Sequence, residues 1–99
     1  MLPFQELEHT ADIAFLVQAE TMELLHLHAE MALCFKYPSL CRFLSHEYKT
    51  SLDEIIISLN ELIARADKEI GCPFKAVCFH GELRKNATHL FEWEMIIDV

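Results

Sequence analysis

A chain of 99 residues fits a single domain, spanning residues 1–99, and its 53% hydrophobic content provides enough apolar surface for a packed core. Sixteen acidic residues against eight basic ones give a formal net charge of -8, which excludes a basic stripe along a phosphate backbone. We therefore expect no direct nucleic-acid binding. An acidic surface suits a basic protein partner or a hard cation, and it also favours solubility.

The apolar runs and the cysteines limit the cellular setting. Each apolar run is far shorter than the roughly 20 residues of a membrane-spanning helix, and we find no signal peptide. The spacing of the cysteines contains no C-x-x-C pair and does not form a zinc site. We expect a cytoplasmic protein without a membrane span, with reduced and mostly buried thiols at Cys34, Cys41, Cys72 and Cys78.

The first stretch that points to chemistry is Glu8-His9-Thr10-Ala11-Asp12, which gathers an imidazole, a hydroxyl and two carboxylates. Residues 13–19 follow with the length and apolar content of a strand buried on both faces, although periodicity alone does not separate this from a buried helical turn. Residues 4–8 are too short to assign. A local interpretation stays open, since His9 and Asp12 can cap a turn by bonding nearby amides.

A first helix is predicted from Thr21, a capping residue, to Tyr37, where Pro38 prevents continuation. His26 and His28 are two residues apart on this helix, so they cannot chelate one metal from one face. Residues 40–44 are predicted as a loop or a short helical turn, and residues 47–50 as a weak strand.

The second helix has the clearest pattern in the chain. Ser51 and Glu54 have the spacing of a capping box, while Gly71 and Pro73 mark the end. Between them apolar residues recur at three and four positions and form one stripe: Leu52, Ile55, Ile56, Leu59, Leu62, Ile63, Ala66 and Ile70.

A terminal hairpin is predicted from strands at 74–83 and 90–99 around turn residues 84–88. In the last strand Trp93 belongs to an apolar face and Asp98 to the opposite, acidic face. A four-residue loop would place Lys75 beside Asp98, whereas a three-residue loop would turn Lys75 to the Trp93 face. We expect His80 to be a hydrogen-bonded core histidine.

Asp98 is a carboxylate in an otherwise apolar run, and such a charge needs a partner or a metal. We expect it to meet His9 and Asp12, a set of donors that suits Mg, Mn or Ca with open water positions. Duller interpretations remain: Asp98 can be a solvated chain end, and Lys75 a solvent-facing edge residue.

In order and spacing the chain resembles the archease family. The likeness covers nearly the whole chain and rests on Glu8-His9-Thr10-Ala11-Asp12-Ile13, the Thr-led helix, Leu59-Asn60-Glu61-Leu62-Ile63, Lys75-Ala76-Val77-Cys78-Phe79-His80 and Ile97-Asp98-Val99. The chain departs from the family in lacking the strands and loop that archeases carry between the second helix and the lysine-led strand. Glu20 also replaces a glycine that is common before the threonine.

The resemblance implies an accessory protein, not an enzyme, that activates a GTP- and metal-dependent RNA ligase in tRNA splicing. Archease promotes guanylylation of the ligase by delivering or positioning a divalent metal, Mg, Mn or Ca. Carried over to this chain, Asp12 and Asp98 would be metal ligands, His9 a ligand or a residue that orients one, and Lys75 a functional basic group beside them.

Two other classes of function are open. A small hydrolase would need a nucleophile turn or a glycine-rich phosphate loop, and the sequence shows neither. A protein-interaction module that keeps the archease fold without metal-dependent activation is the stronger alternative. For either function we expect an α+β two-layer sandwich in the order β-α-β-α-β-β, with two helices packed on a mostly antiparallel sheet.

Overall fold

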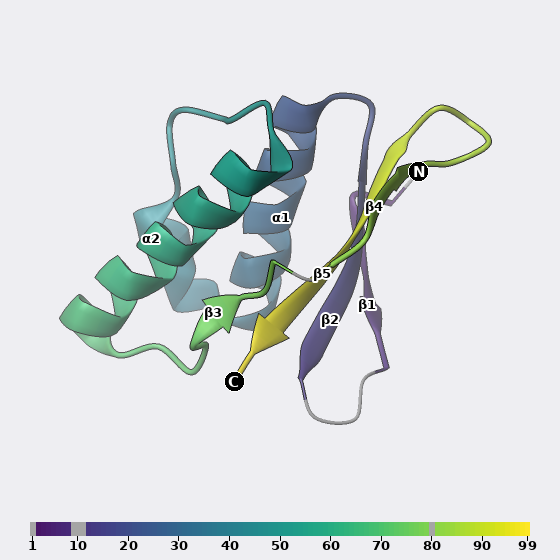
Figure 1. Cartoon of the computed structure of the whole chain (residues 1–99). Coiled ribbons are helices and arrows are strands. Elements are labelled where there is room, and N and C mark those ends of the chain that lie inside the picture. The colour runs from purple at the N-terminus through teal and green to yellow at the C-terminus, as the bar shows by residue number, and fades with distance from the viewer. Residues whose placement is uncertain (1, 9–11, 80) are drawn as a thin grey trace.

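The computed structural model describes residues 2–8, 12–79 and 81–99. Along the chain its elements are β1 (Phe4–Leu7), β2 (Ile13–Ala19), α1 (Met22–Lys36), the 3-10 helix η1 (Pro38–Phe43), α2 (Leu52–Ile70), β3 (Ala76–Val77), β4 (Leu83–Lys85) and β5 (Phe91–Asp98). Figure 1 shows the helices on one side of a twisted sheet.

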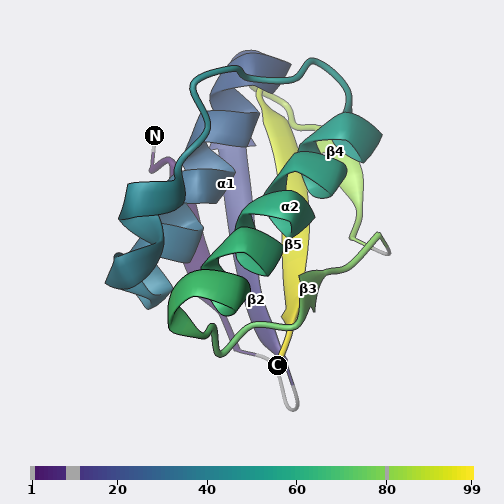
Figure 2. The same cartoon turned by 90° about the vertical axis from the view of Figure 1, so that its left-hand side faces the viewer.

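The sheet is antiparallel throughout, and β2 and β5 form its centre. The strand order is β1-β2-β5-β3, and β4 pairs with β5 on the same edge as β3. Both α1 and α2 lie across one face, as the two views show (Figures 1 and 2). The predicted two-layer α+β architecture is therefore confirmed.

Both helices begin at the predicted caps. The Thr21 hydroxyl accepts a hydrogen bond from the Leu24 amide at 3.1 Å, and the Ser51 hydroxyl accepts one from the Glu54 amide at 3.3 Å. Each bond satisfies an amide that has no partner within the first turn of its helix. The helix ends at Lys36 and Ile70 are close to the predicted ends.

The core fills the space between the helices and one face of the sheet. Trp93, Met95 and Ile97 of β5 are fully buried there, opposite the apolar stripe of α2 that includes Leu59 and Leu62. The alternation predicted for β5 is thus confirmed. In contrast, β2 is not buried on both faces as predicted, because its Leu16 and Gln18 are partly exposed.

Two element predictions need correction near the helices. Residues 4–8, left unassigned, contain strand β1, which pairs with β2. Residues 47–50 do not form the predicted strand, because the amides of this segment and of Ser45 before it bond to side chains of α1 where the structure shows a partner. The Lys49 amide donates to His26 Nδ1 at 2.9 Å, and the Ser45 amide donates to a Glu30 carboxylate oxygen at 2.9 Å.

The predicted continuous strand 74–83 is also wrong, since β3 and β4 are separate strands that both pair with β5. Val77 lies opposite Ile97 and Leu83 opposite Trp93, so the chain between β3 and β4 holds two more residues than the matching part of β5. Gly81 permits this bend: a Cβ there would lie 2.1 Å from the Glu94 carbonyl oxygen. Close backbone approach thus explains the break.

The same bend changes the hairpin register. Ala76, and not Lys75, lies opposite Asp98, which corrects the prediction that Lys75 faces this carboxylate. The pairing of β3 agrees with the alternative prediction, in which Lys75 is turned to the same face of the sheet as Trp93. The loop itself is longer than either prediction, since Lys85 pairs with Phe91. The Asn86 side-chain oxygen accepts three hydrogen bonds within the turn, from the Thr88 amide and hydroxyl and the Leu90 amide.

All four cysteines are free, as expected, but Cys34 is the one buried thiol; Cys41 is exposed, and Cys72 and Cys78 are half-buried. The prediction of mostly buried thiols is therefore wrong. Among the described residues, no helix is both long enough and apolar enough to span a membrane.

Candidate functional site

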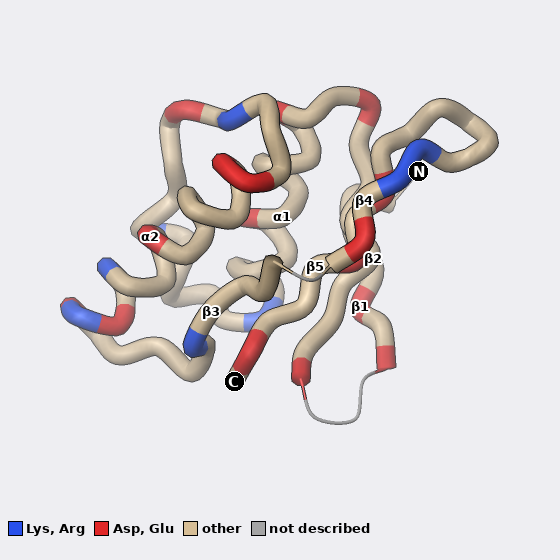
Figure 3. The backbone as a smooth tube through the Cα atoms, viewed as in Figure 1, with Lys and Arg blue, Asp and Glu red and all other residues tan. Residues whose placement is uncertain are grey.

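Asp12 and Asp98 come to the same end of the two central strands. Asp12 directly precedes β2, Asp98 is the last residue of β5, and their neighbours Ile13 and Ile97 are paired in the ladder. Acidic positions accordingly mark the start of β2 and the end of β5 at one end of the sheet (Figure 3). We call this pair of carboxylates the acidic corner. The expectation that the two ends of the chain meet agrees with this register.

The Cys78 thiol lies close enough to the acidic corner to sense both carboxylates. The Cys78 amide donates to the Ile96 carbonyl at 2.8 Å, which places Cys78 beside β5 and near Asp98. Burial, and then the negative charges of Asp98 and Asp12, raise the pKa of the Cys78 thiol. The sulfur therefore stays protonated at neutral pH, a form that neither attacks electrophiles nor binds metals readily.

Lys75 lies beside the corner through its backbone. Its amide donates to the Asp98 carbonyl oxygen at 2.7 Å, and its side chain is exposed. No ion pair joins the Lys75 ammonium to Asp98 within the part of the chain that the structure describes. The Lys75 backbone thus lies beside the corner, and its ammonium is not fixed against Asp98.

Asn60 of α2 fixes the strand that flanks the corner, a role that the sequence analysis did not identify. Its side-chain oxygen accepts from the Val77 amide at 2.7 Å, and its side-chain nitrogen donates to the Val77 carbonyl at 3.2 Å. The amide thereby substitutes for a neighbouring strand and ties β3 to the helix. The sequence signal was a polar residue between two buried leucine positions, Leu59 and Leu62.

The described residues supply two carboxylates for a cation. Among residues 2–8, 12–79 and 81–99, no group of three or more His, Cys, Asp or Glu side chains could hold a metal ion. His9, the predicted third member, lies outside the described residues, and so does His80, the predicted core histidine. Two carboxylates with the remaining positions open to water are compatible with a hard ion such as Mg²⁺.

A second polar cluster, also missed, lies inside the molecule between α1 and residues 44–50. His26 and Glu30 are fully buried and one helical turn apart. The His26 ring contacts the Tyr48 ring edge-to-face, with 5.2 Å between the ring centroids. His26 Nε2 and the second Glu30 oxygen have no hydrogen-bond partner among the described residues. Burial, with a smaller contribution from Lys49, lowers the pKa of His26 to about 4, and burial raises the pKa of Glu30.

These pKa shifts favour the uncharged forms of both side chains. His26 and Glu30 are on the buried side of α1, where Ser45 and Lys49 close them off from solvent. A substrate could not reach this pair, so we assign it a role in packing and not in catalysis. The acidic corner remains the candidate site, because it brings together two carboxylates, with Asp98 exposed and Asp12 half-buried. Comparisons of the chain with protein-family models, curated proteins and solved structures find no match.

Proposed function

We propose that this chain is an archease-like accessory protein that activates a GTP- and metal-dependent RNA ligase, with the acidic corner as the part that acts on the ligase. The observation that carries the proposal is the pairing of Ile13 with Ile97, which brings Asp12 and Asp98 to one end of the sheet. The motifs that resemble archease contribute these same two residues. Support therefore comes from independent features, sequence order and strand register.

The residues of the corner fit a divalent metal of the hard class. Mg²⁺ in proteins is commonly held by one or two carboxylates together with waters and substrate phosphates, and Ca²⁺ also takes oxygen ligands. Asp12 and Asp98 would hold the ion, with His9 as a ligand or orienting group. When bound, the metal would neutralise negative charge on the triphosphate during guanylylation of the ligase.

The chain's own residues contribute position and charge. The central β2 and β5 ladder fixes the backbone on both sides of the corner, and Asn60 holds β3 against its flank. The Lys75 ammonium, exposed at the edge, is available to contact an anionic group that approaches the corner. Nothing in this arrangement requires the chain to carry out the chemical step.

A protein-interaction module is the second candidate function. It is favoured by one observation: within the described residues the corner has two carboxylates and no third ligand of the His, Cys, Asp or Glu type. Such a module would bind the ligase without promoting guanylylation, so binding and activation must be measured separately.

The test pairs the purified chain with the ligase encoded in the same organism and follows the transfer of labelled GMP from GTP to the ligase. We expect a weak, metal-dependent stimulation, because the chain lacks a segment that archeases carry. Asp98→Asn should abolish the stimulation. Glu61→Gln, which removes an equal charge from the exposed side of α2, is the matched control and should retain it.

Two outcomes would count against this function. If Asp98→Asn stimulated guanylylation as well as the unchanged chain, activation would not use the acidic corner. If the folded chain bound the ligase but gave no stimulation with Mg²⁺, Mn²⁺ or Ca²⁺ present, the interaction-module function would replace it.

A further inference from the structure

The face of the sheet opposite the helices carries a regular row of side chains along β5. The helix-facing residues Trp93, Met95 and Ile97 are buried, so the alternate residues Glu92, Glu94, Ile96 and Asp98 lie on the other face. None of the described helices covers this face (Figures 1 and 2). We call it the open face. Successive side chains in the row are about 7 Å apart, as strand geometry requires.

Apolar side chains from the neighbouring strand accompany this row. Leu16 lies opposite Glu94, and Ala14 lies opposite Ile96. Leu16 and Ile96 are partly exposed and Ala14 is fully buried, and none of the described helices lies over them (Figures 1 and 2). Along β5 the open face therefore presents two acidic residues, Glu92 and Glu94, then the apolar Ile96 and then Asp98, where it ends at the acidic corner.

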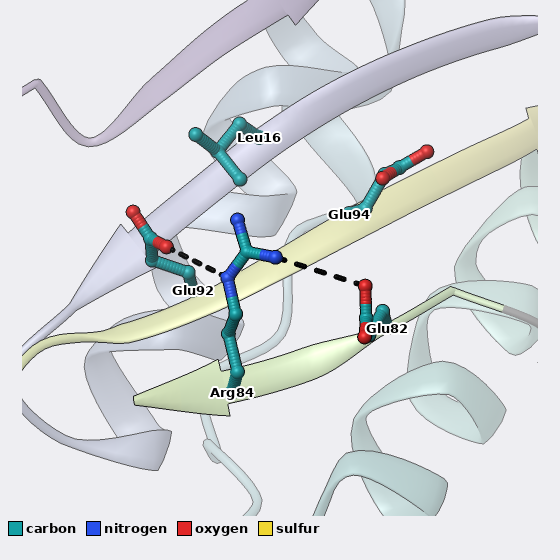
Figure 4. Close-up of a pocket in the computed structure, with 5 residues that line it drawn as sticks. All are labelled: Leu16, Glu82, Arg84, Glu92 and Glu94. Carbon is teal, nitrogen blue, oxygen red and sulfur yellow. Dashed lines mark hydrogen bonds and ion pairs between the residues drawn. The ribbon is translucent and has the colours of Figure 1, made fainter. Parts of the chain in front are cut away.

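One end of the row is held rigidly. The Glu92 carboxylate accepts hydrogen bonds from Gln18 Nε2 at 2.6 Å, Arg84 Nε at 3.1 Å and Asn86 Nδ2 at 3.3 Å. These hydrogen bonds lower the pKa of Glu92, and those from Asn86 and Arg84 contribute most. The Glu92 carboxylate is therefore charged at neutral pH. Arg84 Nη1 also lies 3.7 Å from a carboxylate oxygen of Glu82. Figure 4 shows Arg84 between these two glutamates, with Leu16 and Glu94 beside it.

Glu94 differs from Glu92. Its carboxylate has no hydrogen-bond or ion-pair partner among the described residues, yet the side chain is partly buried beside Leu16. The hollow lined by Leu16, Glu82, Arg84, Glu92 and Glu94 leaves room for about 10 Å³, roughly one water molecule. This hollow is too small for a small organic ligand.

We propose that the open face is a docking surface for a basic protein segment that places an apolar side chain on Leu16 and Ile96 and a basic side chain against Glu94. Charge decides the occupant: a second copy would set the same acidic row against itself, and nucleic acid would bring phosphates to carboxylates. The proposal rests on the proposed function in one respect, since the RNA-binding surface of a ligase supplies such a basic segment.

The experiment has one arm that does not need the ligase. The probe is the synthetic peptide Lys-Ser-Lys-Ser-Leu-Ser-Lys, whose alternate residues match the row, and binding is followed by amide chemical shifts of the labelled chain. We expect shifts at Leu16, Glu94 and Ile96, and a binding constant at least threefold weaker for Glu94→Gln than for Glu61→Gln. Shifts of equal size on α2, or equal weakening by both variants, would overturn the docking surface and indicate unspecific attraction only.

The second arm measures binding of the chain to the purified ligase in chelator, separately from guanylylation with metal. We expect Glu94→Lys to weaken binding at least tenfold, whereas Asp98→Asn should bind within a few fold of the unchanged chain and fail to stimulate. Unchanged binding by Glu94→Lys would overturn the docking surface while the function of the corner still stood. Absence of any ligase binding would end the proposed function, and the peptide arm would still decide the docking surface.

Discussion

The buried imidazole of His26 links the stability of this protein to pH. Burial and the nearby Lys49 lower its pKa in the folded state to about 4, whereas an unfolded histidine titrates near about 6.5. Between these values the unfolded chain binds a proton that the folded chain does not, so the free energy of unfolding falls as the pH is lowered from about 6.5 to 4. The loss can reach about 3 kcal/mol.

His26→Asn isolates this contribution, because an asparagine oxygen can take the place of Nδ1 as acceptor for the Lys49 amide but does not titrate. Urea unfolding of both proteins at several pH values should show a flatter pH dependence in the variant. Glu30 acts in the opposite sense, since burial raises its pKa and folding then favours the protonated carboxyl. Equal slopes for His26→Asn and the unchanged chain would contradict the assignment.

Gly81 is a second residue with a measurable consequence. A Cβ at this position would lie 2.1 Å from the Glu94 carbonyl oxygen and 2.7 Å from Trp93 Nε1, so Gly81→Ala should cost about 1 to 3 kcal/mol by overpacking. It should also alter the fluorescence of Trp93, the single tryptophan. Gly71→Ala is the matched control: Gly71 has open space around it, so its cost comes from a φ of 77° and the Trp93 signal should not change.

At the scale of elements, the side-chain amide of Asn60 is the connection between α2 and the short strand β3. Asn60→Ala removes both bonds to Val77 and should cost about 1 to 3 kcal/mol, because two backbone groups of a buried residue lose their partner. The Cys78 thiol, next along the chain, should then react faster with a thiol reagent. Glu61→Ala, on the exposed side of the same helix, should change neither quantity by much.

The elements that could be predicted from the sequence are those whose signals are local. The caps at Thr21 and Ser51, the stripe of α2 and the alternation along β5 each depend on residues within one element. The pairing of β3 and β4 depends on how closely Gly81 approaches another strand, and no local pattern encodes that distance. The weak strand expected at 47–50 failed because His26, distant in sequence, takes up the Lys49 amide, and Glu30 takes up the Ser45 amide just before this stretch.

At the scale of the whole molecule, the candidate site was predictable in part. Asp12 and Asp98 stood out because each is a carboxylate next to an apolar strand, and the β2 and β5 register brings both to one end. Lys75 was expected to face Asp98, but a register shift of one residue reverses the side on which a side chain lies. The acidic face of β5 was predicted from its alternation, but Leu16 and Ala14 beside it were not, because their place depends on the register between β2 and β5.

The most direct test of the acidic corner is the melting temperature of the purified chain with and without a divalent ion. With Mg²⁺, Mn²⁺ or Ca²⁺ at tenfold its dissociation constant, binding to the folded state alone should add about 1.4 kcal/mol, which is a rise of about 5 to 10 °C. Asp12→Asn and Asp98→Asn should each remove the rise, whereas Glu94→Gln on the open face should keep it. A rise that persisted unchanged in both aspartate variants would contradict a metal site at the corner.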